Sequence, residues 1–524
     1  MNILRWDGVL VKILMLGFLL IFILFPSSFV LIFLFKHSRE VVGFFSESSR
    51  IFLVTEALVF SLKIALTVAS VDLVFGLPFA WLLAKERLPA SRLLENITSL
   101  PLALPTSALG FSAAVFWTFS KIPLSAFWFL VLVHLSFTFP FVVGILTPAL
   151  KRGTGSLEQA ATILGAPKLT VIRTIVLPQI KLELTTAVFF SFARSLSETG
   201  ATIVALTVFG LSQATAPVLI SQFSNGGEGQ ISYNERLLLA ALISGVLILI
   251  SLTLFSIVQL LVGKRSLPVF SKLVSFEAGM DSVLLKRVKN FFLFGFLVFI
   301  ILIPPFFILN QVLKVQTLNI RLLMTYLFNS LLIAFSTILI NLIIGTPMAY
   351  FLAHTNSRKL KRLMNFLVDI PLVVPTVALG FSLALYWRGQ TLISSDLPLV
   401  ILAHLTFTYP YAVRTLCDAF TGLSQEFIDA ARSFGASPIM VLRSVVLPLL
   451  SPSFATAAVL VVARSLGETG ATMAVSSEVI TAPVYIVDLV NEYQIRQAGI
   501  ASALLITLSF GVFALLRRSA FARR

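Results

Sequence analysis

The chain has 524 residues, of which 58% are hydrophobic and 12% charged, and its formal net charge is +16. Its mean hydropathy of +0.99 excludes an ordinary soluble globular protein. The single cysteine, Cys417, excludes an internal disulfide bond and a metal cluster held by several thiolates.

Apolar runs long enough to cross a bilayer recur along the whole sequence and predict an all-α, polytopic membrane protein of about 12 transmembrane helices. In the first half the predicted spans cover roughly residues 11–35, 56–84, 97–119, 126–150, 182–207 and 237–262. In the second half they cover roughly residues 290–313, 323–353, 365–387, 397–416, 452–475 and 498–516. The first run is too long for a signal peptide, so we expect a retained helix.

Basic residues are concentrated in alternate loops between these spans, and this alternation predicts the orientation of the chain. In the first half they are Lys85, Arg87, Arg92, Lys151, Arg152, Lys168, Arg173 and Lys181. The intervening loops at 224–236 and 476–497 are poorer in Lys and Arg. By the positive-inside rule, both termini and the basic loops face the cytoplasm. Much of the net charge is therefore a topology signal, and we expect no nucleic-acid partner.

Several segments recur 270 positions later in the chain, which predicts two repeated units. The segments 101–112, 134–140, 159–178 and 194–202 return as 371–382, 404–410, 429–448 and 464–472. Each unit has an even number of spans with the same charge bias, so both should have the same orientation, related by a pseudo-twofold axis along the membrane normal. We expect a first repeat at 1–262, a cytoplasmic linker at 263–289 and a second repeat at 290–524, with a pathway on the axis.

The repeated loop at 159–178 carries a motif that predicts a docking element. Good helix formers precede a glycine suited to a helix C-cap, and a second segment is expected to start at the proline that follows, Pro167 or Pro438. Small alanines on such a helix allow a partner surface to approach closely, whereas the alternative is an ordinary interfacial connection. The candidate docking residues are Gln159, Ala160, Ala161, Gly165, Leu177 and Pro178, and in the second copy Asp429, Ala430, Ala431, Gly435, Leu447 and Pro448.

The repeated segments 194–202 and 464–472 place ionisable residues inside hydrophobic spans. Arg194 and Glu198, like Arg464 and Glu468, are four residues apart and share a helix face, so they can form an ion pair. Such groups are costly in lipid, and they either line a polar pathway or fix helix packing. The neighbouring candidates for a pathway or gate are Ser195, Thr199, Gly200, Ser465, Thr469 and Gly470, with the helix-breaking pairs Pro105–Thr106 and Pro375–Thr376.

Other residues indicate no catalytic or metal chemistry. His134 and His404 are symmetry-related, but two neutral ligands without carboxylates make a poor metal site, so we expect them to pack with local hydrogen bonds. No phosphate-binding loop with its Lys and Ser/Thr occurs, so the chain is not expected to hydrolyse ATP. We predict neither an enzyme nor a resident cofactor.

The loop motif, an acidic or amide residue and two alanines followed by Gly and then I-x-L-P, resembles the coupling loop of ATP-binding-cassette importer permeases. The whole chain resembles two type I permease units fused in one polypeptide. The resemblance implies short helices seated on two copies of a cytoplasmic ATPase, which binds the ATP, and an extracytoplasmic substrate-binding protein. It also implies the plasma membrane of a prokaryote, the inner membrane if Gram-negative. Gln159 departs from the usual glutamate, although Glu158 lies beside it.

Two clues to the substrate disagree. The segments 194–201 and 464–471 resemble the pore-helix motif of molybdate, tungstate and sulfate permeases, whereas fusion of both halves resembles ferric-iron and thiamine permeases. We favour an oxyanion, because the motif shared with the oxyanion permeases consists of pore-helix residues. A 12-helix proton-coupled secondary transporter, which also has two parallel halves, is the alternative of a different class.

Overall fold

The structure is a computed structural model that describes residues 9–44, 48–86, 91–152, 155–226, 231–261, 283–310, 319–389, 393 and 395–521. Every regular element within these ranges is a helix, which confirms the predicted all-α class. Most of the expected linker at 263–289 lies outside the described residues, so the predicted boundary between the repeats stays a prediction.

The helices of the first half follow one another with short connections. They are α1 (Val9–Phe18), η2 (Leu19–Leu24), α2 (Phe25–Lys36), α3 (Ser38–Phe44), α4 (Ser48–Lys85), α5 (Ser91–Ser99), η3 (Leu100–Ala103), α6 (Thr106–Phe119), α7 (Ala126–Arg152), α8 (Gly155–Ile163), α9 (Lys168–Val171), η4 (Ile172–Val176), α10 (Leu177–Gln179), α11 (Lys181–Leu196), α12 (Gly200–Phe209), α13 (Ala216–Ser224) and α14 (Tyr233–Leu261).

The second half repeats this order. Its helices are α16 (Val283–Phe296), η5 (Leu297–Leu302), α17 (Ile303–Phe306), η6 (Phe307–Asn310), α18 (Ile320–His354), α19 (Arg358–Val373), α20 (Thr376–Gly389), α21 (Asp396–Thr421), α22 (Gln425–Ser433), α23 (Pro438–Val441), η8 (Leu442–Val446), α24 (Leu447–Leu466), α25 (Gly470–Val475), α26 (Ala482–Asn491) and α27 (Ile495–Phe521).

Eight helices in the described part of the chain are long and apolar enough to cross a membrane, or 11 if three sharply bent pairs each count as one span. Two of the bent pairs are the predicted spans at 97–119 and 365–387, which turn by 103° and 101° beside Pro105 and Pro375. The predicted spans at 182–207 and 452–475 are also interrupted, because α11 ends before α12 and α24 before α25. These four interruptions lie in the repeated motifs.

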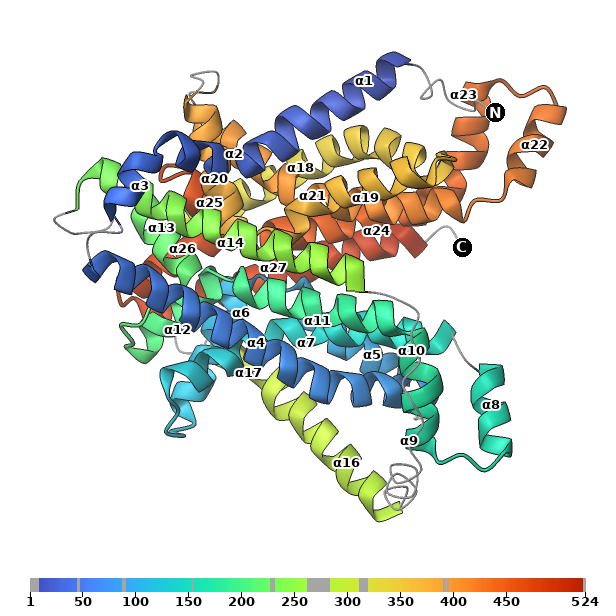
Figure 1. Cartoon of the computed structure of the whole chain (residues 1–524), viewed down its shortest axis with the longest axis horizontal. Helices are drawn as coiled ribbons and strands as arrows, with labels where there is room; N and C mark the ends of the chain where they lie inside the picture. Colours follow the sequence, from blue (N-terminus) through green and yellow to red (C-terminus); the bar gives the residue numbers. More distant parts are fainter. Residues whose placement is uncertain are drawn as a thin grey trace.

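The first helix of each half packs on the other half (Figure 1). α2 packs on α20, and α17 packs on α6. In the first contact the Ser382 hydroxyl accepts a hydrogen bond from Val30 N at 2.9 Å and donates to the Pro26 carbonyl at 2.7 Å. The hydroxyl is thus inserted between the carbonyl and the N–H that would otherwise form one hydrogen bond of the helix. Ser112 does the same in the other half, between Ile308 N at 2.9 Å and the Pro304 carbonyl at 2.7 Å.

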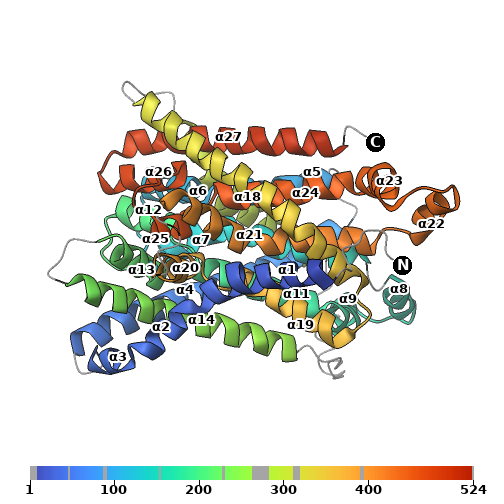
Figure 2. The same ribbon diagram turned by 90° about the horizontal axis from the view of Figure 1, so that it is seen from above.

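These exchanged helices let the two halves form one packed body. The halves also meet along α14 and α20, α6 and α27, and α12 and α26. The short helices α8 and α22 lie at the same end of the molecule in both views, as the repeat predicts (Figures 1 and 2). The long helices pack pairwise behind them, α4 on α7 and α18 on α21.

A buried carboxylate in α4 has an amide counterpart in α18. Asp72 is 0% exposed and accepts a hydrogen bond from the Ser191 hydroxyl at 2.6 Å. Asn341, at the equivalent place, donates to the Thr408 hydroxyl at 2.8 Å. Thr408 and its counterpart Thr138 each donate to the carbonyl of a histidine one turn earlier, so their lone pairs remain free to accept. Position 72 therefore suits an amide as well as a carboxyl group.

The exchange Asp72→Asn should leave the free energy of unfolding unchanged, because an amide oxygen can accept from Ser191 and its nitrogen can donate to Thr138. Asp72→Ala should lower it by about 1–3 kcal/mol, because the buried Ser191 hydroxyl loses its partner. Thermal unfolding of the purified protein in detergent measures both, with Asn341→Ala as the matched control. A loss in Asp72→Asn as large as in Asp72→Ala would contradict this assignment.

Candidate functional site

The repeated loop motif forms a short exposed helix in each half, α8 and α22, which ends at a glycine in the left-handed region. Gly165 has φ +82° and Gly435 has φ +78°, a conformation that L side chains rarely adopt. The helix ends are closed by hydrogen bonds from Ala166 N to the Ala161 carbonyl at 3.0 Å and from Ala436 N to the Ala431 carbonyl at 3.1 Å. This is the C-cap geometry that the sequence predicts.

Both helices leave apolar residues uncovered at their ends. Ile163, Leu164 and Phe434 are 85%, 86% and 91% exposed. The candidate residues Gln159, Ala160, Asp429 and Ala430 are exposed as well, and Ala161 and Ala431 are half-buried. An exposed apolar tip next to small residues is typical of a surface that another protein covers. No observation here tests the docking role of these residues, so it stays a prediction.

The Leu-Pro pairs of the motif begin the helices that lead to the ion pairs. Leu177 and Pro178 begin α10, and α11 follows at Lys181, while Leu447 and Pro448 begin α24. In the first half Glu158 of α8 is paired with Lys85 at the end of α4, with a Nζ–Oε1 distance of 2.9 Å. α8 and α22 are thus connected to the first turns of α11 and α24, and Arg194 and Arg464 lie in the last turns of the same two helices.

Both predicted ion pairs form at the ends of α11 and α24. The distance from Arg194 Nη2 to Glu198 Oε2 is 2.7 Å, and that from Arg464 Nη1 to Glu468 Oε2 is 2.6 Å. The Arg194 guanidinium carbon lies 5.3 Å from the ring centroid of Phe137, and that of Arg464 lies 5.0 Å from Phe407. Charge pairing and aromatic faces together compensate for the loss of water around each guanidinium.

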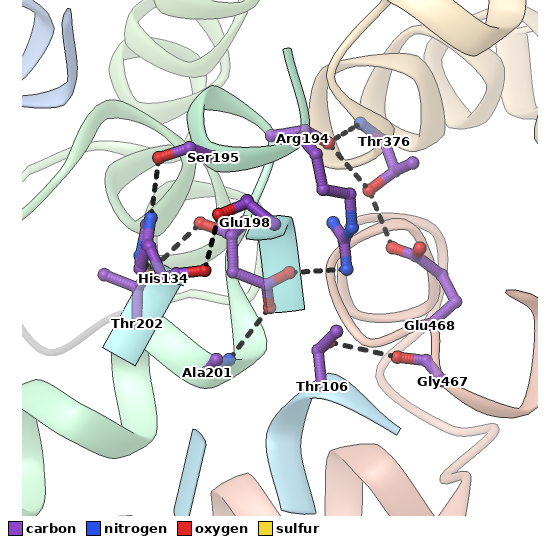
Figure 3. A network of polar contacts seen from close by, with 12 residues as sticks. Thr106, His134, Arg194, Ser195, Glu198, Ala201, Thr202, Thr376, Gly467 and Glu468 are labelled. Atoms are coloured by element: carbon purple, nitrogen blue, oxygen red, sulfur yellow. Dashed lines mark hydrogen bonds and ion pairs between the residues drawn. The ribbon is translucent and has the colours of Figure 1, made fainter. Parts of the chain in front are cut away.

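Each glutamate also stabilises the interruption of its own helix, and Figure 3 shows this contact for Glu198. Glu198 Oε1 accepts from Ala201 N at 3.0 Å in the first turn of α12, and Glu468 Oε1 accepts from Ala471 N at 3.0 Å in α25. A helix that starts within a membrane has unpaired N–H groups that must find partners inside the protein. One carboxylate therefore neutralises an arginine and caps a helix at the same time.

The two halves touch at Thr199, Gly200, Thr469 and Gly470, here called the Thr–Gly crossing. A Cβ placed on Gly200 would lie 2.5 Å from Thr469 Oγ1, and one on Gly470 would lie 2.6 Å from Thr199 Oγ1. This reciprocal contact is the one that a twofold axis requires. Thr199 and Thr469 are each 2% exposed, and their hydroxyls have no hydrogen-bond partner among the described residues. The crossing is therefore tightly packed and lined by two unpaired hydroxyls.

A small pocket lies beside the ion pairs and receives both arginines. Its lining includes Arg194 and Arg464, the hydroxyl residues Ser197, Thr376 and Tyr411, and the aromatic residues Phe141, Phe190 and Phe407. Phe141 and Tyr411 lie in the parts of α7 and α21 that run toward α8 and α22, so the pocket is on the docking-loop side of the crossing. At about 30 Å³ it has room for about two water molecules.

The threonines that follow the helix-breaking prolines each contact the interrupted helix of the other half. Thr376, which follows Pro375, donates its backbone N–H to the Ser197 hydroxyl at 3.0 Å and its own hydroxyl to Glu468 at 2.7 Å. Thr106, which follows Pro105, donates to the Gly467 carbonyl at 3.3 Å. The structure thus brings the predicted pathway residues of both halves together around one axis.

Each of the two histidines contacts the segments on both sides of a helix interruption. His134 Nδ1 lies 2.8 Å from Ser195 Oγ, and Nε2 lies 3.0 Å from Thr202 Oγ1. His404 makes the same contacts with Ser465 at 2.7 Å and Thr472 at 2.9 Å. These contacts join residues 61 or 68 positions apart, so they are not the local hydrogen bonds that the sequence predicts. The local ones are donated by Thr138 and Thr408 to the carbonyls of the two histidines. Ser195 and Thr202 keep the same spacing from the histidine in the second repeat, and this is the signal that could reveal their contacts.

Comparison with known families matches the chain twice. The sequence model of the family described as "Binding-protein-dependent transport system inner membrane component" matches residues 76–267 and 345–524. The matches begin within α4 and α18, at equivalent places of the two repeats. The description names a transport component rather than an enzyme, and it favours an importer permease over the secondary transporter.

Three curated relatives show the range of similarity. A molybdate/tungstate transport system permease protein of Pyrococcus abyssi is 33% identical over 203 residues, covering 39% of this chain and 81% of the relative. A probable sulfate transport system permease protein of Nephroselmis olivacea is 33% identical over 42% of this chain and 78% of the relative. A molybdenum transport system permease protein of Azotobacter vinelandii is 31% identical over 34% of this chain and 85% of the relative.

The exchanges Gly200→Ala and Gly470→Ala should each lower the free energy of unfolding by about 1–3 kcal/mol, because the new methyl group cannot fit against the threonine across the axis. Thermal unfolding in detergent measures the loss. Gly144→Ala in α7 is the control, since a Cβ there would meet nothing within 4 Å. Equal stability of all three variants would show that the halves do not approach closely at the crossing.

Proposed function

This chain belongs to the binding-protein-dependent transport system inner membrane components, with two permease units fused in one polypeptide, and we propose that it forms the translocation pathway for a small oxyanion. Molybdate, tungstate and sulfate are the substrates that we favour. The observation that carries the proposal is the pocket that receives one buried arginine from each half. The printed names of the relatives, which concern molybdate, tungstate and sulfate, support the same choice.

In this proposal the Thr–Gly crossing is the gate. While it is closed, each arginine is neutralised by the glutamate one turn away, and no charge is left uncompensated. When the halves separate, the guanidinium groups can present their N–H donors to an anion, for which arginine is well suited. The unpaired hydroxyls of Thr199 and Thr469 would then line the opened path, where they can also donate to the anion.

The same proposal assigns the energy source to other chains. α8 and α22 dock on two copies of a cytoplasmic ATPase, which binds ATP, so this chain itself needs no cofactor. Closure of the ATPases moves the short helices and, through α11 and α24, the two ion pairs. A binding protein delivers the substrate from outside the cell. The chain crosses the plasma membrane of a prokaryote, the inner membrane if Gram-negative, with both termini in the cytoplasm.

The test is ATP-dependent uptake into proteoliposomes that hold this chain, its co-purifying ATPase and its binding protein. Molybdate, sulfate, ferric iron and thiamine are compared under identical conditions. We expect uptake of molybdate or sulfate and none of iron or thiamine. Uptake of iron or thiamine alone would overturn the oxyanion assignment and show that the fused architecture is the better clue to the substrate.

The double exchange Gly165→Ala and Gly435→Ala should abolish co-purification of the ATPase, because alanine is strained at the positive φ that both helix ends require. Pull-down of the ATPase on the affinity-tagged membrane chain measures the loss. Gly155→Ala at the start of α8 is the control, since it has open space around its Cα and no positive φ. Normal co-purification of the double variant would refute the docking role of these helices.

A further inference from the structure

The repeated motif at 194–202 differs from its copy at 464–472 in one residue. Ser197 in the first half corresponds to Gly467 in the second, while Arg194, Glu198, Thr199 and their counterparts are identical in type. The Ser197 hydroxyl accepts the N–H of Thr376, the first residue of α20, at 3.0 Å. It therefore caps a helix of the other half. Gly467 has no side chain to cap α6 in the same way.

This difference changes what the two threonine hydroxyls do. With its N–H bound to Ser197, Thr376 points its hydroxyl at Glu468 Oε1, at 2.7 Å. Thr106 instead donates to the Gly467 carbonyl, at the longer distance of 3.3 Å. The contact of Thr376 thus connects the interruption of the first half to the ion pair of the second half, and no equivalent contact to Glu198 exists within the described residues.

The two glutamates are consequently held unequally. Glu468 has three partners within the described part of the chain, namely Arg464, Ala471 N and Thr376. Glu198 has two, namely Arg194 and Ala201 N. A hydrogen bond to a charged group shifts an equilibrium by about tenfold or more. The carboxylate of Glu198 is therefore the easier one to displace from its arginine.

We propose that Arg194 is the arginine that leaves its glutamate to contact the transported anion, whereas Arg464 stays with Glu468 and acts as a positioning residue. The inference rests on the proposed function, because it names which side chain of that pathway binds the oxyanion. In the pocket both guanidinium groups are present, but only Glu468 is held by a further side chain, the hydroxyl of Thr376. The N–H of Thr376 is in turn bound by Ser197 of the opposite half. One half thus binds the anion while the other keeps the gate aligned.

The first arm of the test needs no substrate. Thr376→Val removes the third partner of Glu468, and Thr106→Val removes only the longer contact with a backbone carbonyl. We expect the thermal unfolding midpoint to fall by about 1–2 °C more in Thr376→Val than in Thr106→Val. Equal midpoints, or a larger loss in Thr106→Val, would overturn the inequality of the halves whatever the substrate is.

The second arm measures oxyanion uptake in the complete complex with its ATPase and binding protein. Lysine keeps the charge but loses the planar fork of donors, so Arg194→Lys should reduce uptake by about tenfold or more. Arg464→Lys should reduce uptake less and should lower the unfolding midpoint more. The reverse order, or equal losses of uptake, would overturn the assignment of Arg194.

A third comparison separates this inference from the proposed function. In a Thr376→Val background both glutamates have two partners, so the effects of Arg194→Lys and Arg464→Lys on uptake should become similar. An unchanged difference between them would overturn the role given to Thr376. If the wild-type complex accumulates ferric iron or thiamine instead of an oxyanion, the proposed function fails, while the stability arm still decides whether the halves are unequal.

Discussion

The carboxylate at each of the two helix interruptions satisfies two requirements that a membrane imposes on a broken helix. The interruption at 197–199 exposes N–H groups of α12, and within a bilayer only the protein can accept their hydrogen bonds. Glu198 accepts one of them and neutralises Arg194 with its other oxygen. Glu468 repeats both contacts. Without a carboxylate at this position the break would cost unpaired backbone groups and an unpaired cation, so the arrangement of the other gate residues depends on it.

The breaks in turn allow the halves to approach on the axis. Because α12 and α25 start with glycine, the backbone of one half can meet the threonine of the other with no Cβ between them. The exchanged first helices add contacts between the halves away from this crossing, since Ser112 and Ser382 bind the carbonyls of Pro304 and Pro26. Each serine also accepts the N–H one turn later. The halves are thus held together at the centre and at the periphery.

The sequence could predict the local parts of this site and not the contacts between halves. Arg194 and Glu198 are four residues apart, which predicts their ion pair, although Glu198 lies just beyond the end of α11. Gly165 predicts the end of α8 for the same local reason. The contact of Thr376 with Ser197 joins residues 179 positions apart in different repeats, and it follows only from the packing of one half on the other. The interruption of 182–207 does not follow from the sequence, because hydrophobic residues continue on both sides of the motif at 194–202.

Fusion of the two repeats gives the protein a freedom that two identical subunits lack. In a symmetric dimer each substitution appears on both sides of the axis, so the partners of the two glutamates must be the same. In one polypeptide, Ser197 can face Thr376 while Gly467 faces Thr106, and Asp72 can be paired with Ser191 while Asn341 binds Thr408. Ser197 then binds the N–H of Thr376, whose hydroxyl is the third partner of Glu468. In the proposed pathway, the duplicated helices keep the gate closed on its axis, and the divergence at these few buried positions decides which half responds to an anion.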